Sequence, residues 1–229
     1  MIKDPPLLTI RRNFARPSPE QISAFANVPT GHAVDAMGGR GALDYRIKPL
    51  TQLRSVMVGT AITCHCGPAD NLALVAAIAT AKAGDVLVAA TDGCTVTSVT
   101  GDLLMGMARN RGIAGLVTDG VVRDLAGILS VGLPVYCVGL SPNSAARNGP
   151  GSLGLPVVIG GVAVASGDLI VADNDGVVAV PRGEIEKIVA QLAEVRTAEA
   201  ALEAKVKAGL EFPDYIQKIL SSEHVQEVS

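Results

Sequence analysis

The sequence predicts an α/β fold, a layered sandwich with a partly parallel central sheet, a β-hairpin block and a C-terminal helical extension. Three observations favour it: strand-like and helix-like segments alternate over residues 85–138, short β-rich segments follow over residues 156–180, and an amphipathic segment begins at residue 182. At about 150 residues per domain, a chain of 229 residues forms one large domain with appendages or two small ones. We expect an α/β domain over residues 1–181 and a helical extension over residues 182–229.

The N-terminal part contains one well-marked helix start. Ser18 can cap a helix, Pro19 suits the first helical position and Gln21 completes a capping box, so a helix is expected over residues 19–26. A looser segment with several glycines follows. The β-branched, apolar run over residues 55–64 then predicts a buried strand, and residues 70–83 predict a helix.

Strands and helices alternate through the middle of the chain. Strands are expected at residues 85–90, 113–118 and 133–138, and helices at residues 101–111 and 124–130. This βαβ rhythm predicts parallel pairing of the strands.

Short hairpins and a long helix complete the predicted elements. Strands are expected at residues 156–159, 162–164, 169–172 and 177–180, and turns rich in Gly, Asp and Asn join them. These hairpins should extend or cap the first sheet. The tail from residue 182 to about 208 predicts an amphipathic helix, which Gly209 closes, and Pro213 opens a final short helix.

The composition excludes several classes of partner. With 3% aromatic residues and a net charge of −3, the chain is not expected to bind nucleic acid. The longest stretch without charge or His, residues 125–146, contains three glycines and two prolines, so it indicates core elements rather than a membrane helix. No signal peptide is visible and the four cysteines have apolar surroundings, which predicts a cytoplasmic protein. A mean hydropathy of +0.38 favours a homo-oligomer with apolar interfaces.

The residues most informative about chemistry lie between Gly101 and Asp124. If Asp102 opens a helix, the backbone N–H groups of Asp102, Leu103 and Leu104 can hold a small anion such as a carboxylate. The pair Arg123–Asp124 follows the next predicted strand through a turn. Because the ends of neighbouring parallel strands lie side by side, both segments are expected to converge on one crevice.

Two carboxylates, one guanidinium and an anion-holding helix end suit metal-assisted chemistry on a keto acid. A hard cation such as Mg²⁺ takes oxygen ligands, so Asp124 can bind it directly and Asp102 through a water. Arg123 can donate to a developing oxyanion. A 2-oxo acid that chelates the ion is activated for carbon–carbon cleavage beside a pyruvate unit. In a purely structural interpretation, both aspartates are helix N-caps and Arg123 pairs with a surface carboxylate.

Four segments resemble one known family. They are residues 83–89 (Ala-Gly-Asp-Val-Leu-Val-Ala), 101–124, 133–136 (Leu-Pro-Val-Tyr) and 166–181, and the resemblance covers most of the chain from about Thr30 onward. The family is that of the regulator of ribonuclease activity A, the RraA-like family. It includes class II pyruvate aldolases that cleave 4-hydroxy-4-methyl-2-oxoglutarate and 4-carboxy-4-hydroxy-2-oxoadipate.

The resemblance implies a divalent-metal-dependent lyase acting on a small 2-oxo acid. Asp124 would bind Mg²⁺, Mn²⁺ or another divalent metal, and Asp102 would reach that metal through water. Arg123 would bind the keto oxygen and stabilise the enolate, while Gly101, Asp102, Leu103 and Leu104 would hold the carboxylate. Cleavage would give pyruvate and a second carbonyl product, and oxaloacetate would give the same enolate by decarboxylation.

The resemblance also implies an assembly, a homo-oligomeric trimer or hexamer with the site at a subunit interface. In the aldolases a glutamate from the C-terminal helix of a neighbouring subunit completes the site, and Glu199 is the best match here. It would help to hold the water that takes the C4 hydroxyl proton. A non-catalytic regulator that binds and inhibits a ribonuclease is the alternative function, and the extension after Pro181 argues against it.

Glu199 also stands out from the residue pattern. It falls on an apolar stripe at helical spacing, which consists of Ile188, Leu192, Val195, Leu202 and Val206. A carboxylate on a burying face needs a partner. Glu194 and Glu203 are the alternates, and a solvated Glu199 paired with Arg196 is the structural alternative.

The remaining candidates favour structural roles. Side chains alternate along a strand, so His65 should face away from Cys64 and Cys66, and no zinc site is expected. Asp173 and Asp175 fit a hairpin turn better than a calcium loop.

His32 can pair with Asp35 as acid and base, or lie at the surface beside a helix end. The family often has Ser-Asp where this chain has Val34-Asp35. Cys94 and Cys137 are expected in the core.

Overall fold

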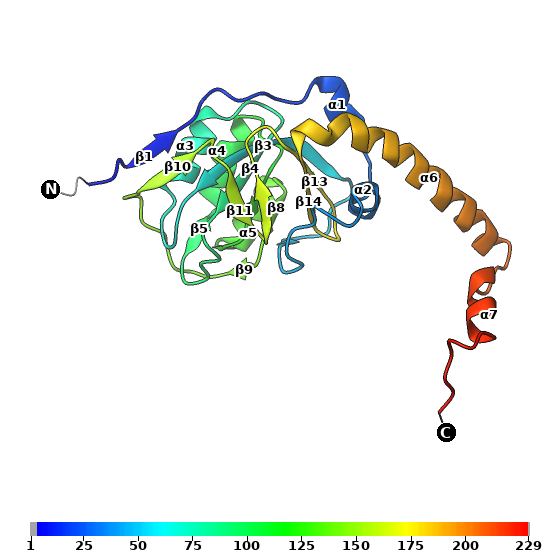
Figure 1. Cartoon of the computed structure of the whole chain (residues 1–229). Coiled ribbons are helices and arrows are strands. Elements are labelled where there is room, and N and C mark those ends of the chain that lie inside the picture. Colours follow the sequence, from blue (N-terminus) through cyan, green and yellow to red (C-terminus); the bar gives the residue numbers. More distant parts are fainter. Residues whose placement is uncertain (1–3, 229) are drawn as a thin grey trace.

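A computed structural model describes residues 4–228 and contains a large mixed sheet (Figure 1). In sheet order its strands are β1 (Leu8–Ile10), β10 (Gly151–Leu153), β3 (Met57–His65), β4 (Asp85–Ala90), β6 (Gly115–Thr118), β8 (Val135–Cys137) and β2 (Lys48–Pro49). The hairpin of β13 (Leu169–Ala172) and β14 (Val177–Val180) joins this sheet through β3.

Parallel pairing runs through the middle of the sheet. β3, β4, β6 and β8 pair in parallel, as the βαβ rhythm predicts. The outer edge of β3 pairs antiparallel with β13 near its start and with β10 near its end. β11 (Val157–Ile159) and β12 (Val162–Val164) form a separate antiparallel pair. The predicted hairpins therefore both extend and cap the main sheet.

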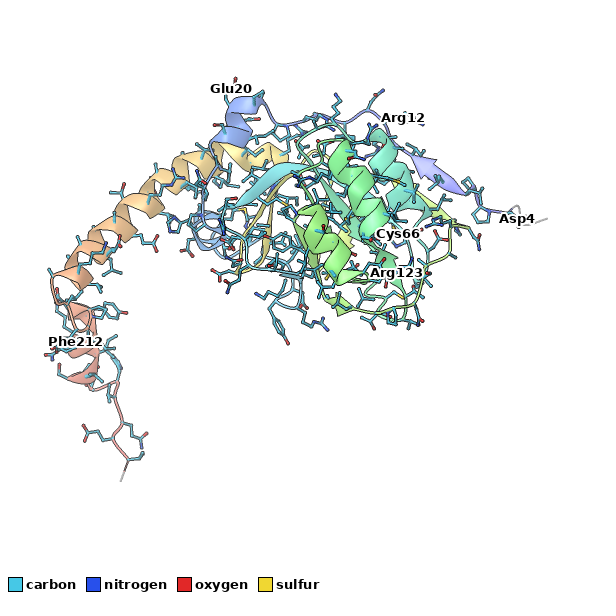
Figure 2. All side chains as sticks on the ribbon, turned by 180° about the vertical axis from the view of Figure 1, so that it is seen from behind. Asp4, Arg12, Glu20, Cys66, Arg123 and Phe212 are labelled. Carbon is cyan, nitrogen blue, oxygen red and sulfur yellow. The ribbon has the colours of Figure 1, made fainter. Side chains whose placement is uncertain are left out.

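Helices cover the sheet in layers. They are α1 (Pro19–Ser23), α2 (Thr30–Ala36), α3 (Leu72–Thr80), α4 (Asp102–Asn110), α5 (Leu125–Val131), the 3-10 turn η1 (Arg182–Glu184), α6 (Ile185–Lys207) and α7 (Asp214–Leu220). Figure 2 shows α3, α4 and α5 on one face of the sheet.

The core follows the two-residue period of the strands. Leu87 and Ala89 of β4 pack in the apolar cluster beneath α3, α4 and α5, whereas Val86 and Val88 pack in a second cluster with β11 and β12. A third cluster joins β13 and β14 to α2 and the first half of α6. The continuous apolar strands are thus buried on both faces, which is typical of parallel sheets.

The second half of α6 leaves the body of the molecule and carries α7 away from it (Figure 1). Ile188 and Leu192 are buried, but Leu202 and Val206 are 50% and 55% exposed. The predicted apolar stripe therefore exists, and one chain covers only its first part. Within residues 4–228 no helix combines the length and apolarity needed to cross a bilayer.

Most predicted elements agree with the structure. The exceptions are elements that depend on contacts with distant residues and strands of only two or three residues. The capping box of Ser18 and Gln21 is present, although α1 ends at Ser23. Helix α2 was expected to be a looser segment. The Asp173 carboxylate accepts hydrogen bonds from the Thr30 N–H and hydroxyl, both at 2.8 Å, and so caps α2 from the distant β13–β14 turn.

Candidate functional site

Three very short parallel strands bring the predicted site residues together. They are β5 (Ser98–Thr100), β7 (Val121–Val122) and β9 (Gly139–Leu140), and none of the three was predicted from the sequence. β5 leads into α4 and β7 leads into α5, and the Arg123 N–H donates to the Thr100 carbonyl at 3.0 Å. This pairing sets the start of α4 beside Arg123 and Asp124.

The two predicted segments line one cavity of about 130 Å³. Its walls include the four residues from Gly101 to Leu104, together with Arg123 and Asp124. Arg123 lies near one end of the helical layer in Figure 2. Ligand pockets for drug-sized molecules span ~300–1,000 Å³, so this cavity suits a smaller molecule or one end of a larger one.

Two glycines allow the carboxylates to approach the neighbouring helix starts. A Cβ at Gly101 would lie 2.3 Å from Asp124 Oδ2, and a Cβ at Gly127 would lie 2.4 Å from Asp102 Oδ2. Each aspartate therefore lies against the helix that carries the other. Any larger residue at either glycine would displace a carboxylate.

Asp124 does not behave as an ordinary helix cap. It precedes α5 with φ 60° in the left-handed region, and its side chain makes no capping hydrogen bond. Its Oδ2 lies 3.3 Å from Arg123 Nε, and its side chain is 42% exposed. A non-glycine residue in this conformation carries a backbone cost of order 1 kcal/mol, which is common at functional sites. The carboxylate is available to a ligand.

Asp102 and the start of α4 form the anion-holding part of the cavity. Gly101 is the N-cap and Asp102 the first helical residue, and Asp102 Oδ1 accepts from the Leu103 N–H at 2.7 Å. The N–H groups of Asp102 and Leu104 fall in the first turn, where an α-helix offers no acceptor. A bound carboxylate can satisfy them and gain from the helix dipole.

Five further polar residues, none of them predicted from the sequence, also line this cavity: Asn71, Ser98, Thr100, Ser144 and Arg147. Arg147 and Ser144 follow β9, and the Ser144 hydroxyl accepts a hydrogen bond from Arg123. Asn71 is 4% exposed, and its Nδ2 donates to the Val99 carbonyl at 2.8 Å. Its buried Oδ1 has no partner in the structure. Such an orphaned acceptor favours a ligand that donates a hydrogen bond.

Glu199 lies away from this cavity within one chain. Its carboxylate contacts His32 Nε2 on α2, and the side chain is 57% exposed. The suggested pairs of His32 with Asp35 and of Glu199 with Arg196 are therefore wrong. Glu199 lies over α2, where α6 still packs on the body of the protein. This packing of α6 on α2 brings Glu199 to His32. Among residues 4–228, the buried His32 Nδ1 atom has no hydrogen-bond partner.

The alternates and the other candidate residues lie elsewhere. Glu194 is exposed on α6, and Glu203 forms an ion pair with Lys207 one turn later. His65 points outward to Asp92 at 2.9 Å while Cys64 and Cys66 are buried, as strand alternation predicts.

Two further predictions concern the turn after β13 and the cysteines. The turn aspartates are structural, since Asp173 caps α2 and also accepts from the Asp175 N–H at 2.9 Å. Cys137 is in the core, but Cys94 is only half-buried because its loop lies at the surface, so its predicted core position is wrong.

Comparison with known proteins identifies the family of this chain. The RraA-like family model, described as Aldolase/RraA, matches residues 30–179. A protein of Halalkalibacterium halodurans, named as a candidate 4-hydroxy-4-methyl-2-oxoglutarate aldolase, is 36% identical over 187 residues, which are 82% of this chain and 87% of that protein.

Two solved structures share the fold. An uncharacterised protein from Pseudomonas syringae pv. tomato superposes with a TM-score of 0.76 at 26% identity, covering 86% of this chain and 92% of that one. RraAS2 of Streptomyces coelicolor, an unusual member of the RNase ES inhibitor RraA family, superposes with a TM-score of 0.74 at 29% identity, covering 83% and 99%. The matched range 30–179 contains every residue that lines the cavity, and the chain belongs to the RraA-like family.

Proposed function

We propose that the protein is a divalent-metal-dependent aldolase that cleaves 4-hydroxy-2-oxo acids to pyruvate and a second carbonyl product, and that it also decarboxylates oxaloacetate. The likeness to the H. halodurans protein supports the aldolase class. The observation that carries the proposal is the shared cavity of Asp102, Arg123 and Asp124 at the start of α4.

The donor set fits a hard divalent cation. Asp124 offers a carboxylate without a capping role, Asp102 offers a second one, and none of the residues lining the cavity is His or Cys. Within residues 4–228 no group of three or more acidic, His or Cys side chains is gathered for a metal. Mg²⁺ or Mn²⁺, which retains waters and shares substrate oxygens, suits one or two carboxylates. When bound, such an ion polarises the keto group of the substrate.

The residues of the chain divide the work of binding and charge stabilisation. The first-turn N–H groups of α4 hold the carboxylate next to the keto carbon. Arg123 donates to the keto oxygen and stabilises the negative charge that develops there as the C3–C4 bond breaks. Decarboxylation of oxaloacetate develops the same charge, so one set of residues serves both reactions.

Substrate discrimination follows from the polar residues around the cavity. We assign Arg147 as partner for a distal carboxylate of the substrate. A water held between Asp102 and the Glu199 of a second copy takes the C4 hydroxyl proton. Glu199 is 57% exposed and lies about one turn before the exposed Leu202 and about two turns before the exposed Val206 of α6, which supports its action in a neighbouring subunit and an interface role for residues 182–229.

A coupled assay tests the proposal. Pyruvate release from 4-hydroxy-4-methyl-2-oxoglutarate is followed through lactate dehydrogenase and NADH, with and without EDTA and added Mg²⁺. EDTA should abolish turnover and Mg²⁺ restore it. Asp124→Asn should lose most activity, because Asn keeps the left-handed backbone but removes the charge.

Asp92→Asn is the matched control. Asp92 also has positive φ, at 56°, and its side chain is 57% exposed in a single ion pair. Near-normal turnover of Asp124→Asn, or turnover that survives EDTA, would contradict the proposal.

Inhibition of a ribonuclease is the second candidate, and the likeness to S. coelicolor RraAS2 favours it. Pull-down of a ribonuclease E-type enzyme with a measured loss of its RNA cleavage, together with no pyruvate release, would replace the aldolase proposal.

A further inference from the structure

An N-terminal strap, residues 11–15, crosses the surface between two firm anchors. At its start, β1 pairs with β10, and the Arg11 N–H donates to the Leu153 carbonyl at 2.9 Å. At its end, the Arg16 guanidinium donates two hydrogen bonds to the Asp85 carboxylate, at 2.6 and 2.8 Å. The Lys82 N–H also donates to this carboxylate, at 2.7 Å. The strap is therefore held at both ends by the body of the protein.

Close backbone contacts fix the path of the strap. A Cβ at Gly154 would lie 2.0 Å from the Arg11 carbonyl oxygen, and a Cβ at Gly167 would lie 2.2 Å from the Ala15 carbonyl oxygen. Both glycines also have positive φ, at 77° and 99°, where larger residues are strained. Only glycine lets the strap approach this closely at both places.

A cavity of about 770 Å³ lies between the strap and the body of the protein. Its apolar walls come from both sides, namely Ile10 and Phe14 from the N-terminal segment and Ile62, Ala79 and Leu153 from the body. Cavities of ~300–1,000 Å³ with apolar walls and a few convergent polar groups are typical of small-molecule sites.

The charge on this cavity is strongly one-sided. Four cationic side chains line it, from Arg11, Arg12, Arg16 and Lys82, and none of the lining residues is Asp or Glu. Asp85 neutralises Arg16, and within residues 4–228 no carboxylate lies within 4.0 Å of the other three cations. The whole chain has a net charge of −3, so this local excess of positive charge is not a general property of its surface. Guanidinium groups match carboxylate and phosphate oxygens.

We propose that this cavity binds a small organic anion that carries two or more carboxylate or phosphate groups on an apolar body. The cations on the strap and at Lys82 bind the anionic groups, and the apolar walls cover the body. The cavity shares no lining residue with the one at Arg123 and Asp124, and in Figure 2 Arg12 and Arg123 lie at different ends of the helical layer. The inference is independent of the aldolase proposal.

Calorimetric titration of the full chain at low ionic strength tests the inference. Benzene-1,3,5-tricarboxylate and hydroquinone bisphosphate supply the two anion chemistries on an apolar body, and citrate and pyrophosphate supply them without one. We expect one site per chain and at least tenfold tighter binding of an apolar-bodied anion than of its counterpart. The tighter of the two apolar-bodied probes identifies the anionic group. The absence of saturable binding of both at millimolar concentration would overturn the inference.

Variants locate the site. The double variant Arg11→Ala/Arg12→Ala should weaken binding at least tenfold with an unchanged melting temperature, because both side chains are exposed. Arg54→Ala/Lys218→Ala removes the same charge from exposed positions elsewhere and should leave the affinity unchanged. Arg123→Ala should also have no effect. Equal weakening by both double variants, or loss of binding in Arg123→Ala, would refute a site under the strap.

Discussion

Replacing Gly101 with alanine separates the position of the Asp124 carboxylate from the stability of the fold. Gly101 has φ −143° and ψ −170°, an extended conformation that alanine adopts without strain. A Cβ there would lie 2.3 Å from Asp124 Oδ2 and 3.3 Å from Arg123 Nε. The new methyl group would therefore act on two side chains of the cavity rather than on the backbone.

The size of the effect follows from these distances. Ordinary van der Waals contact begins at 3.4 Å, so the Asp124 oxygen must move by about 1.1 Å, the difference between 3.4 and 2.3 Å. Because that oxygen ends a half-exposed side chain, we expect the free energy of unfolding to change by less than ~1 kcal/mol. A misplacement of ~1 Å at a reacting centre can cost ~100-fold in rate, or about 2.7 kcal/mol of barrier. We predict a loss of that order in kcat/KM.

The assay compares pyruvate release and thermal unfolding for three alanine variants. Gly106→Ala is the control, since its Cβ meets only Val131 Cγ2, at 4.0 Å on the neighbouring helix, and it should keep full activity. Gly127→Ala would place its Cβ 2.4 Å from Asp102 Oδ2 and 2.6 Å from Asp102 Cβ, so it pushes α4 and α5 apart and should lose stability as well as activity. If Gly101→Ala is as active as Gly106→Ala, the reaction does not depend on where the Asp124 carboxylate lies.

Three further predictions concern Glu199, the strap anchor Asp85 and the cysteine thiols. Glu199→Ala should slow aldol cleavage more than oxaloacetate decarboxylation, because only the first removes a hydroxyl proton; equal slowing in the two assays would count against this role. Asp85→Asn deprives the Arg16 guanidinium of its anionic partner, whose side chain is 2% exposed, and should lower the urea-derived free energy of unfolding by ~3 kcal/mol. Asp44→Asn, which weakens a pair with the 67% exposed Arg46, should change this free energy little, and similar losses for the two variants would contradict this reasoning. Burial raises the pKa of the Cys137 thiol, so the half-buried Cys94 should be alkylated first at pH 8, as followed by peptide mass spectrometry. Faster labelling of Cys137 would show that strand β8 opens.

The sequence predicts those helices and strands well whose formation depends on burial and on a regular apolar period. The strand β4 follows from six consecutive buried residues, and α3, α4 and α5 appear within a few residues of their predicted limits. Helix α2 could not be predicted, because its cap is a carboxylate from a turn 143 residues away. The strands β5, β7 and β9 have two or three residues each and leave no periodic signal.

The same distinction applies to the residues of the candidate site, of which some could be predicted from the sequence and others could not. Gly101 to Asp124 was predictable because both segments follow parallel strands, whose ends meet at one edge of a sheet. Asn71 and Arg147 come from distant segments, and nothing in their local sequence marks them. The orphaned Asn71 oxygen becomes visible only once the surrounding side chains are in place.

The left-handed backbone at Asp124 restricts the substitutions open to this position during evolution. Asn and Gly adopt φ near 60° readily, but neither brings a carboxylate, whereas Glu keeps the charge and pays the conformational cost of a longer L-residue. No substitution of Asp124 therefore keeps a carboxylate without a conformational cost. Lineages of this fold in which this position no longer needs a carboxylate should show Asn or Gly there before any other residue.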